Sequence, residues 1–185
     1  MKTHIATSCI PMLFDRTPNQ LARIRIGRTM LPPQANDFRC LDIGEPNCVG
    51  TALLSNADNT FQCDFDYEVI APASQYDIIL ALDVIEHLMN PLLFMENVKK
   101  LLSKHGELYL STSLAREWYP LYPHGNAHFT EYTRSKLYEL FEKSGWKVTQ
   151  ERVFIPFRFR DVFKGFRPIL RLLIQRSIMF RLVKV

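Results

Sequence analysis

The sequence has 185 residues, of which 47% are hydrophobic and 23% are charged, and its net charge is +4. This length suits one hydrophobic core, and the composition excludes a disordered, collagen-like or transmembrane helical protein. We expect a cytoplasmic protein, because the N-terminal residues do not combine an apolar segment with a signal-peptidase site. The four cysteines, Cys9, Cys40, Cys48 and Cys63, have no zinc-ligand or disulfide-framework spacing, so we expect buried thiols and no metal site.

The charge is distributed unevenly along the chain. Residues 146–185 contain 10 Lys and Arg against 2 acidic residues, a net charge of +8, which leaves −4 for residues 1–145. Arginines alternate with aromatic side chains around Phe157 and Phe159, a pattern that suits an anionic membrane better than a nucleic acid. The two interpretations are a solvated basic face, which is the commoner one, and peripheral contact with the inner face of the membrane.

Hydrophobic periodicity, together with the residues that begin and end helices, predicts alternating helices and strands. In chain order the patterns predict a helix from 18 to the proline pair at 32 and 33, a strand at 39–43, a helix at about 51–55, strands at 60–67 and 76–82, a helix at 91–102, a strand at 107–112, a helix at 134–144, a strand at 146–155, a helix at 168–174 and a last strand at 178–183.

Two of these elements indicate the fold class. The run at 76–82 is almost continuously apolar, as in a strand that helices cover on both faces. The helix that Pro91 opens has its apolar residues at three- and four-residue spacing, and Lys104 to Gly106 is its expected end. Strands that alternate with such helices predict an α/β protein with a doubly wound, mostly parallel Rossmann-like sheet and a late antiparallel strand.

We expect a single domain over residues 1–185. It would carry an N-terminal helical extension over 1–36 and a basic helical insertion over 156–177, before the last strand. The long segment at 114–132 is rich in aromatic residues and histidine, and loops of this length are usually functional.

Three segments carry a family resemblance: RCLDIGEPNCVG at 39–50, the stretch at 75–112 that contains DVIEHL, and HFTEYTRSKLYELFEKSGWKV at 128–148. In this order and spacing they resemble the small class I S-adenosylmethionine-dependent methyltransferases of the ubiquinone- and biotin-pathway-like type, with a shortened cofactor-binding half. The resemblance implies a Rossmann-like methyltransferase fold, S-adenosyl-L-methionine as cofactor, and methyl transfer to a small-molecule or lipid-like acceptor.

The first segment corresponds to the cofactor loop of the family. The resemblance implies that Asp42 accepts a hydrogen bond from the amino group of the cofactor and that Gly44 permits the turn, although Asp42 as a cap of this turn is an alternative. Glu45 and Asn47 stand where the family has a glycine-rich run, so we expect the loop to take another course, with the Asn47 side chain as a donor.

The spacing after the first strand is shorter than in the family, and two ways of counting both identify Asp64 as the acid that holds the ribose or adenine side of the cofactor. The alternative is that Asp64 and Asp66 form the polar face of an edge strand.

In DVIEHL, Asp83 ends a buried strand at the sheet edge where ligands of open α/β sheets bind. The resemblance implies that Leu82, Asp83 and Val84 contact the cofactor and that His87 is a wall of the active-site pocket, with a packing role as its alternative. His128 resembles the histidine on the substrate side, where a neutral imidazole could take a proton from the acceptor.

The sequence thus predicts a methyltransferase, with His87 and His128 as its catalytic candidates. The alternative is an inactive methyltransferase fold that serves as a binding or scaffold module, because the loop lacks glycines and the cofactor half is short. A dinucleotide-dependent oxidoreductase is disfavoured, because no G-x-G-x-x-G follows any strand.

Overall fold

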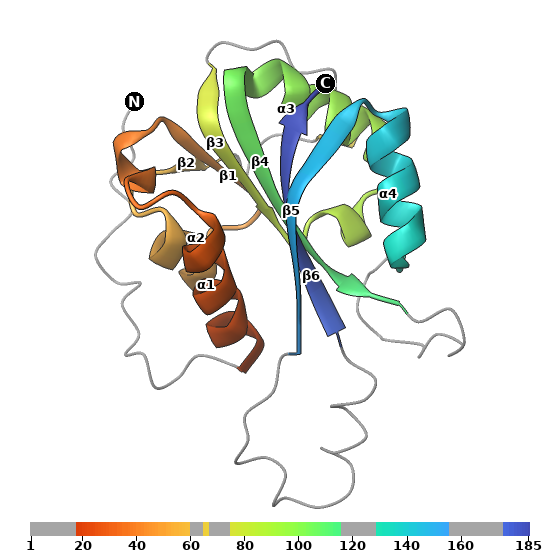
Figure 1. Cartoon of the computed structure of the whole chain (residues 1–185), viewed down its shortest axis with the longest axis horizontal. Coiled ribbons are helices and arrows are strands. Elements are labelled where there is room, and N and C mark those ends of the chain that lie inside the picture. Colours follow the sequence, from red (N-terminus) through yellow and green to blue (C-terminus); the bar gives the residue numbers. More distant parts are fainter. Residues whose placement is uncertain (1–17, 60–64, 67–74, 116–128, 156–175) are drawn as a thin grey trace, which may run out of the picture.

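The structure is a computed structural model that describes residues 18–59, 65–66, 75–115, 129–155 and 176–185. Its strands are β1 (Cys40–Ile43), β2 (Asp58–Asn59), β3 (Tyr76–Leu82), β4 (Leu102–Leu114), β5 (Trp146–Phe154) and β6 (Arg176–Lys184). They form one sheet with the order β2-β1-β3-β4-β6-β5 (Figure 1). The first four strands pair in parallel, and β6 is antiparallel to both β4 and β5. The predicted fold class is confirmed.

Helices cover both faces of this sheet. The α-helices are α1 (Pro18–Met30), α2 (Cys48–Leu53), α3 (Pro91–Leu101) and α4 (Arg134–Lys143), and two 3-10 helices are η1 (Ala35–Asp37) and η2 (Ile85–His87). Helices α1 and α2 lie on one side of the sheet, and α3 and α4 lie on the other (Figure 1).

The core divides between the two faces, and β3 contributes to both. Ile78, Leu80 and Leu82 pack with the α1 and α2 side, whereas Ile79 and Ala81 pack with α3 and α4. Successive side chains of a strand point to opposite faces. The continuous apolar run therefore reflects burial on both sides, as the sequence predicts.

The predicted starts of α3 and α4 are confirmed by their caps. The Asn90 side chain accepts a hydrogen bond from Leu93 N, and Pro91 occupies the first turn of α3. Thr133 accepts from Lys136 N at the start of α4, and Gly145 ends that helix with a φ of +63°. Helix caps can be predicted from a sequence because they act within one helical turn.

The strand predicted at 60–67 is wrong where it can be compared. The edge strand β2 covers only Asp58–Asn59, and Phe65 and Asp66 form a turn. Phe65 is buried with its ring centroid 5.8 Å from that of Phe94, and Asp66 accepts hydrogen bonds from the backbone of Met89, at 2.7 Å, and of Asn90. The alternating pattern at this point reflects one buried ring and one capping carboxylate, not a pleated strand.

Other boundaries differ from the prediction. Helix α2 begins at Cys48 rather than at about 51, and Cys48 is half-buried, not buried like Cys40. Strand β4 begins at Leu102, directly after α3, so the expected helix end at 104–106 lies inside a strand. Strand β6 begins at Arg176, within the expected insertion over 156–177. Residues 156–175, with the helix predicted at 168–174, lie outside the described residues, as do Cys9 and Cys63.

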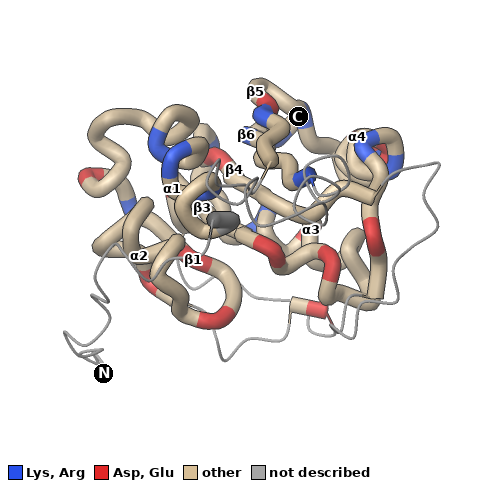
Figure 2. The backbone as a smooth tube through the Cα atoms, turned by 90° about the horizontal axis from the view of Figure 1, so that it is seen from below, with Lys and Arg blue, Asp and Glu red and all other residues tan. Residues whose placement is uncertain are grey.

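Charged residues of both signs are spread over several elements of the described chain (Figure 2). Five of the ten Lys and Arg in 146–185 fall in 156–175, outside the described residues. Arg181, one of the described five, forms an ion pair with Glu107. Among the helices that the structure describes, none has the length and apolar character to cross a membrane.

Candidate functional site

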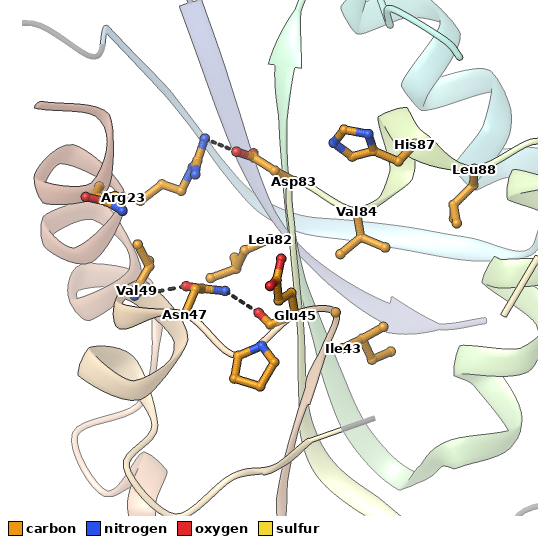
Figure 3. Close-up of a pocket in the computed structure, with 13 residues that line it drawn as sticks. Arg23, Ile43, Glu45, Asn47, Val49, Leu82, Asp83, Val84, His87 and Leu88 are labelled. Carbon is orange, nitrogen blue, oxygen red and sulfur yellow. Dashed lines mark hydrogen bonds and ion pairs between the residues drawn. The ribbon is translucent and has the colours of Figure 1, made fainter. Parts of the chain in front are cut away.

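A cleft of about 460 Å³ opens at the carboxyl ends of β1 and β3 (Figure 3). Three parts of the chain line it: the end of β1 with its loop and the start of α2, the segment from the end of β3 through η2, and helix α1. The lining residues are 20, 23, 43–47, 49, 82–84, 87 and 88. This edge of an open α/β sheet, between neighbouring strands that run in parallel, is where such folds bind ligands.

The loop after β1 turns at Gly44, whose φ is +116°. A side chain at this position would be strained, and its Cβ would lie 3.3 Å from Val84 Cγ2 across the cleft. The absence of a side chain at Gly44 therefore leaves the space between the β1 loop and Val84 unfilled.

Asn47 holds the rest of this loop. Its Oδ1 accepts hydrogen bonds from the backbone N–H groups of Val49 and Gly50, at 2.9 and 3.0 Å, and its Nδ2 donates to the Glu45 carbonyl at 3.0 Å. The amide thus caps α2 and fixes the loop in place of the glycine-rich run of the family. Asn47 and Glu45 line the cleft, and the hydrogen bonds of the Asn47 side chain lie within the loop.

Asp42 lies behind this loop and is not among the described residues that line the cleft. Its exposed fraction is 7%, and its carboxylate packs against Gly50, where a Cβ would lie 1.9 Å from Asp42 Oδ2. Burial raises the pKa of Asp42 to about 7. Within the described residues its carboxylate makes no hydrogen bond to the turn, and its contact with the cofactor stays a prediction.

Asp83 follows β3 with a left-handed backbone, at a φ of +56°, which is uncommon for a residue other than glycine. Its amide donates to the Ser111 carbonyl at 2.9 Å, and Ser111 Oγ lies 3.5 Å from its Oδ1. Leu82, Asp83 and Val84 all line the cleft, and their contact with the cofactor stays a prediction.

Arg23 of α1 reaches across the cleft and forms an ion pair with Asp83 through Nη2 and Oδ2 (Figure 3). Its exposed fraction is 7%, and its buried Nε has no hydrogen-bond partner among the described residues. Sequence reasoning missed Arg23. Its spacing from Gln20 and Gly27 puts it on the inward side of α1 beside Ile24, and this spacing was the available signal.

The 3-10 helix η2 carries Glu86 and His87. His87 lines the cleft, whereas Glu86 is 2% exposed and accepts a hydrogen bond from Thr112 Oγ1 at 2.9 Å. Burial, and then the nearby charge of Asp83, raise the pKa of Glu86 to about 7. The Glu86 carbonyl accepts from Phe129 N, at 2.9 Å, and Thr130 N, at 3.2 Å, so the start of the segment before α4 lies beside η2.

The structure thus brings together seven of the predicted site residues around one cleft: Gly44, Glu45, Asn47, Leu82, Asp83, Val84 and His87. Asp64 and His128 lie outside the described residues. The described part of the chain contains no cluster of His, Cys, Asp or Glu that could hold a metal ion.

The sequence matches the methyltransferase domain family over residues 13–151, about three quarters of the chain. No curated protein matches it. The O-methyltransferase of a trans-AT PKS multienzyme of Brevibacillus brevis, in complex with S-adenosyl-L-homocysteine, has a similar structure, with a TM-score of 0.60, 12% identity and coverage of 89% of this chain and 72% of that chain.

Two further solved structures are similar. An S-adenosylmethionine-dependent methyltransferase of Mesorhizobium loti has a TM-score of 0.58, 13% identity and coverage of 85% of this chain and 95% of that chain. The 1,6-didemethyltoxoflavin-N1-methyltransferase of Burkholderia thailandensis, with bound 1,6-didemethyltoxoflavin and S-adenosylhomocysteine, has a TM-score of 0.59 and 13% identity. The match covers 89% of this chain and 79% of that chain. At these identities the similarity establishes a common fold.

Proposed function

The chain belongs to the methyltransferase domain family, and we propose that it transfers the methyl group of S-adenosylmethionine to a small organic acceptor in the cleft beside β1 and β3. The family membership confirms the resemblance predicted from the three sequence segments, and with it the enzyme class and the methyl donor. The acceptor and the roles of single residues are the proposal.

The observation that carries this proposal is the cleft itself. Four of the predicted site residues line it opposite the β1 loop. They are the strand residue Leu82 and, from DVIEHL, Asp83, Val84 and His87. A volume of about 460 Å³ is within the range of ligand sites that enclose a small molecule. Ligands of doubly wound sheets bind at this edge because the loops of neighbouring parallel strands separate there.

The lining residues fit a ligand with the charges of the methyl donor. The buried Arg23 Nε is a donor without a described partner, which suits a carboxylate, while Asp83 and Glu45 are acids that suit cationic groups. Gly44 leaves open the floor that a Cβ would narrow toward Val84. The β1 loop and η2 would therefore hold the donor from two sides.

When bound, the cofactor supplies an electrophilic methyl group on a sulfonium. The role of the protein is to orient the acceptor along the direction of methyl transfer and to exclude water. Positioning of this kind provides much of the rate acceleration in group transfer. His87, on the cleft wall, is suited to orient the acceptor. We propose that His128 takes the proton when the acceptor is a hydroxyl, and that Asp64 holds the ribose side of the donor.

The basic residues near the C-terminus support a lipid-like acceptor at a membrane surface. The wild-type protein should sediment with vesicles that contain anionic lipid. The variant with Arg167, Arg171 and Arg176 all changed to Gln should stay in the supernatant. Vesicles of neutral lipid are the control. The membrane proposal fails if the wild type does not sediment with anionic vesicles.

Calorimetric titration tests the proposed function. Wild type should bind S-adenosylmethionine and S-adenosylhomocysteine, and each ligand should raise the melting temperature. Val84→Phe would place a ring in the cleft and should abolish binding, whereas Val153→Phe, on the exposed face of β5, adds the same ring elsewhere and should retain it.

The second candidate is the inactive scaffold. It is favoured by the Asn47 cap, which occupies the first N–H groups of α2, and by the ion pair of Arg23 with Asp83 inside the cleft. Absence of heat and of any rise in melting temperature at saturating ligand would leave this candidate in place of the enzyme.

A further inference from the structure

We propose that Arg23 and Asp83 together form the receptor for the amino-acid end of the methyl donor, in which Arg23 binds the carboxylate and Asp83 binds the ammonium group. This inference rests on the proposed function and deepens it. The two residues come from distant parts of the chain, α1 and the end of β3, and they meet inside the cleft (Figure 3).

Arg23 is buried and has an N–H donor without an acceptor among the described residues, as suits an anion-binding residue. It is the only Lys or Arg among the described residues that line the cleft. Its guanidinium is buried, its Nη2 faces Asp83, and its Nε has no hydrogen-bond partner in the described part of the chain. A buried N–H donor without an acceptor is costly, and a planar guanidinium binds a carboxylate with two parallel bonds. A ligand carboxylate in the cleft would remove that cost.

Asp83 has the position of an ammonium-binding residue. Its side chain is 27% exposed, which is more than the 8% of Arg23, so its carboxylate is partly accessible while it pairs with Arg23. Its left-handed backbone and the bond from its amide to the Ser111 carbonyl fix where the side chain leaves the chain. Residues held in such sparsely populated conformations concentrate at ligand sites.

The pair is self-neutralising in the absence of a ligand, and this predicts its selectivity. A zwitterion offers each residue a partner of opposite charge, so one internal ion pair is exchanged for two pairs with the ligand. A ligand with only one of the two charges satisfies one residue and leaves the other buried charge without a new partner, which is unfavourable. The receptor should therefore distinguish an α-amino acid from an amine, an acid or a neutral group.

This assignment gives Asp83 the role that the sequence analysis predicted for Asp42. Asp42 packs against Gly50 behind the β1 loop, whereas Asp83 and Arg23 both line the cleft. The loop of this chain, with Glu45 and Pro46 in place of glycines, thus leaves the contact to the other side of the cleft.

Three ligands test the proposal by calorimetry: S-adenosylmethionine, its decarboxylated form, which lacks the carboxylate, and 5′-methylthioadenosine, which lacks the carboxylate, the ammonium group and the sulfonium charge. Arg23→Met should weaken S-adenosylmethionine by roughly tenfold or more, as for the loss of a charge-assisted hydrogen bond, without weakening the decarboxylated form. Asp83→Asn, which tolerates the left-handed backbone, should weaken both amine-bearing ligands to a similar extent without weakening methylthioadenosine.

Arg25→Met is the matched control, because Arg25 is an exposed residue of the same helix, and this variant should bind all three ligands like the wild type. Retained binding of methylthioadenosine shows that the cleft of each variant is intact. The inference is overturned if Arg23→Met weakens all three ligands equally or none of them. If the wild type binds none of the three, the proposed function itself fails, and this outcome is separate from the others.

Discussion

Replacing Asp42 by Asn should stabilise the protein at neutral and alkaline pH. The carboxylate is buried against Gly50 and receives no described hydrogen bond, so its ionised form is disfavoured in the folded state. Asn has nearly the same shape and no charge, and it therefore removes the cost of ionising a buried group while it keeps the packing.

The magnitude follows from the pKa of Asp42, which burial raises from 3.8 to about 7. Below 3.8 the group is protonated in both states and costs nothing. As pH rises from 3.8 toward 7, the unfolded chain loses the proton first, and the free energy of unfolding falls. Above 7 both states are ionised and the loss is complete. The interval from 3.8 to about 7, at 1.36 kcal/mol for each pH unit, corresponds to about 4 kcal/mol.

Urea unfolding followed by circular dichroism checks this expectation at about pH 4 and about pH 8. Asp42→Asn should unfold like the wild type at the lower pH and be more stable by up to about 4 kcal/mol at the higher pH. Asp37→Asn, the same change at an exposed position, controls for the loss of one negative charge. The reasoning would be refuted if the variant is less stable than the wild type at the higher pH. It would also be refuted if the free energy of unfolding increases by the same amount at both pH values.

Four further substitutions have defined outcomes. Asn47→Ala removes the cap of α2 and should lower the free energy of unfolding by about 1 kcal/mol in urea titrations. Gly50→Ala, whose Cβ would overlap Asp42, should cost about 1 to 3 kcal/mol in the same measurement. Phe94→Ala in the core beneath α3 should cost about 3 to 5 kcal/mol. Thr112→Val removes a hydrogen bond that stabilises ionised Glu86 and should raise the pKa of Glu86, as a carboxyl carbon titration by NMR would show.

The elements that the sequence predicts well are those whose signals are local. The apolar run of β3 and the proline that opens α3 each act through a few neighbouring residues, and the structure confirms both. The family resemblance rests on the same segments, so the family match confirms it too. The residues carried over from DVIEHL line the cleft, and their contacts with the cofactor stay a prediction.

What the sequence analysis missed depends on tertiary contacts. Asp66 belongs to an alternating pattern, yet its carboxylate caps the backbone before α3, 23 residues away from Met89. Arg23 is one of three arginines in α1, and its function in the cleft appears only when α1 packs beside β3. Asp42 has the residue type expected for a ligand contact, but its carboxylate packs against Gly50 and it is not among the described residues that line the cleft. Periodicity cannot report such long-range contacts.

The strand order has a consequence for how the protein is synthesised. Strand β6 lies between β4 and β5 and pairs with both, although it is made after β5. Strands β1, β3 and β4 can associate while the ribosome is still translating, because β3 pairs with both β1 and β4 and all three are made before β5 and β6. Strand β5 has to wait for β6, so its edge and the adjoining α4 stay unpaired until residues 176–184 leave the exit tunnel. A nascent chain in this state exposes strand edges that favour aggregation, and it is then that this protein would depend most on chaperones.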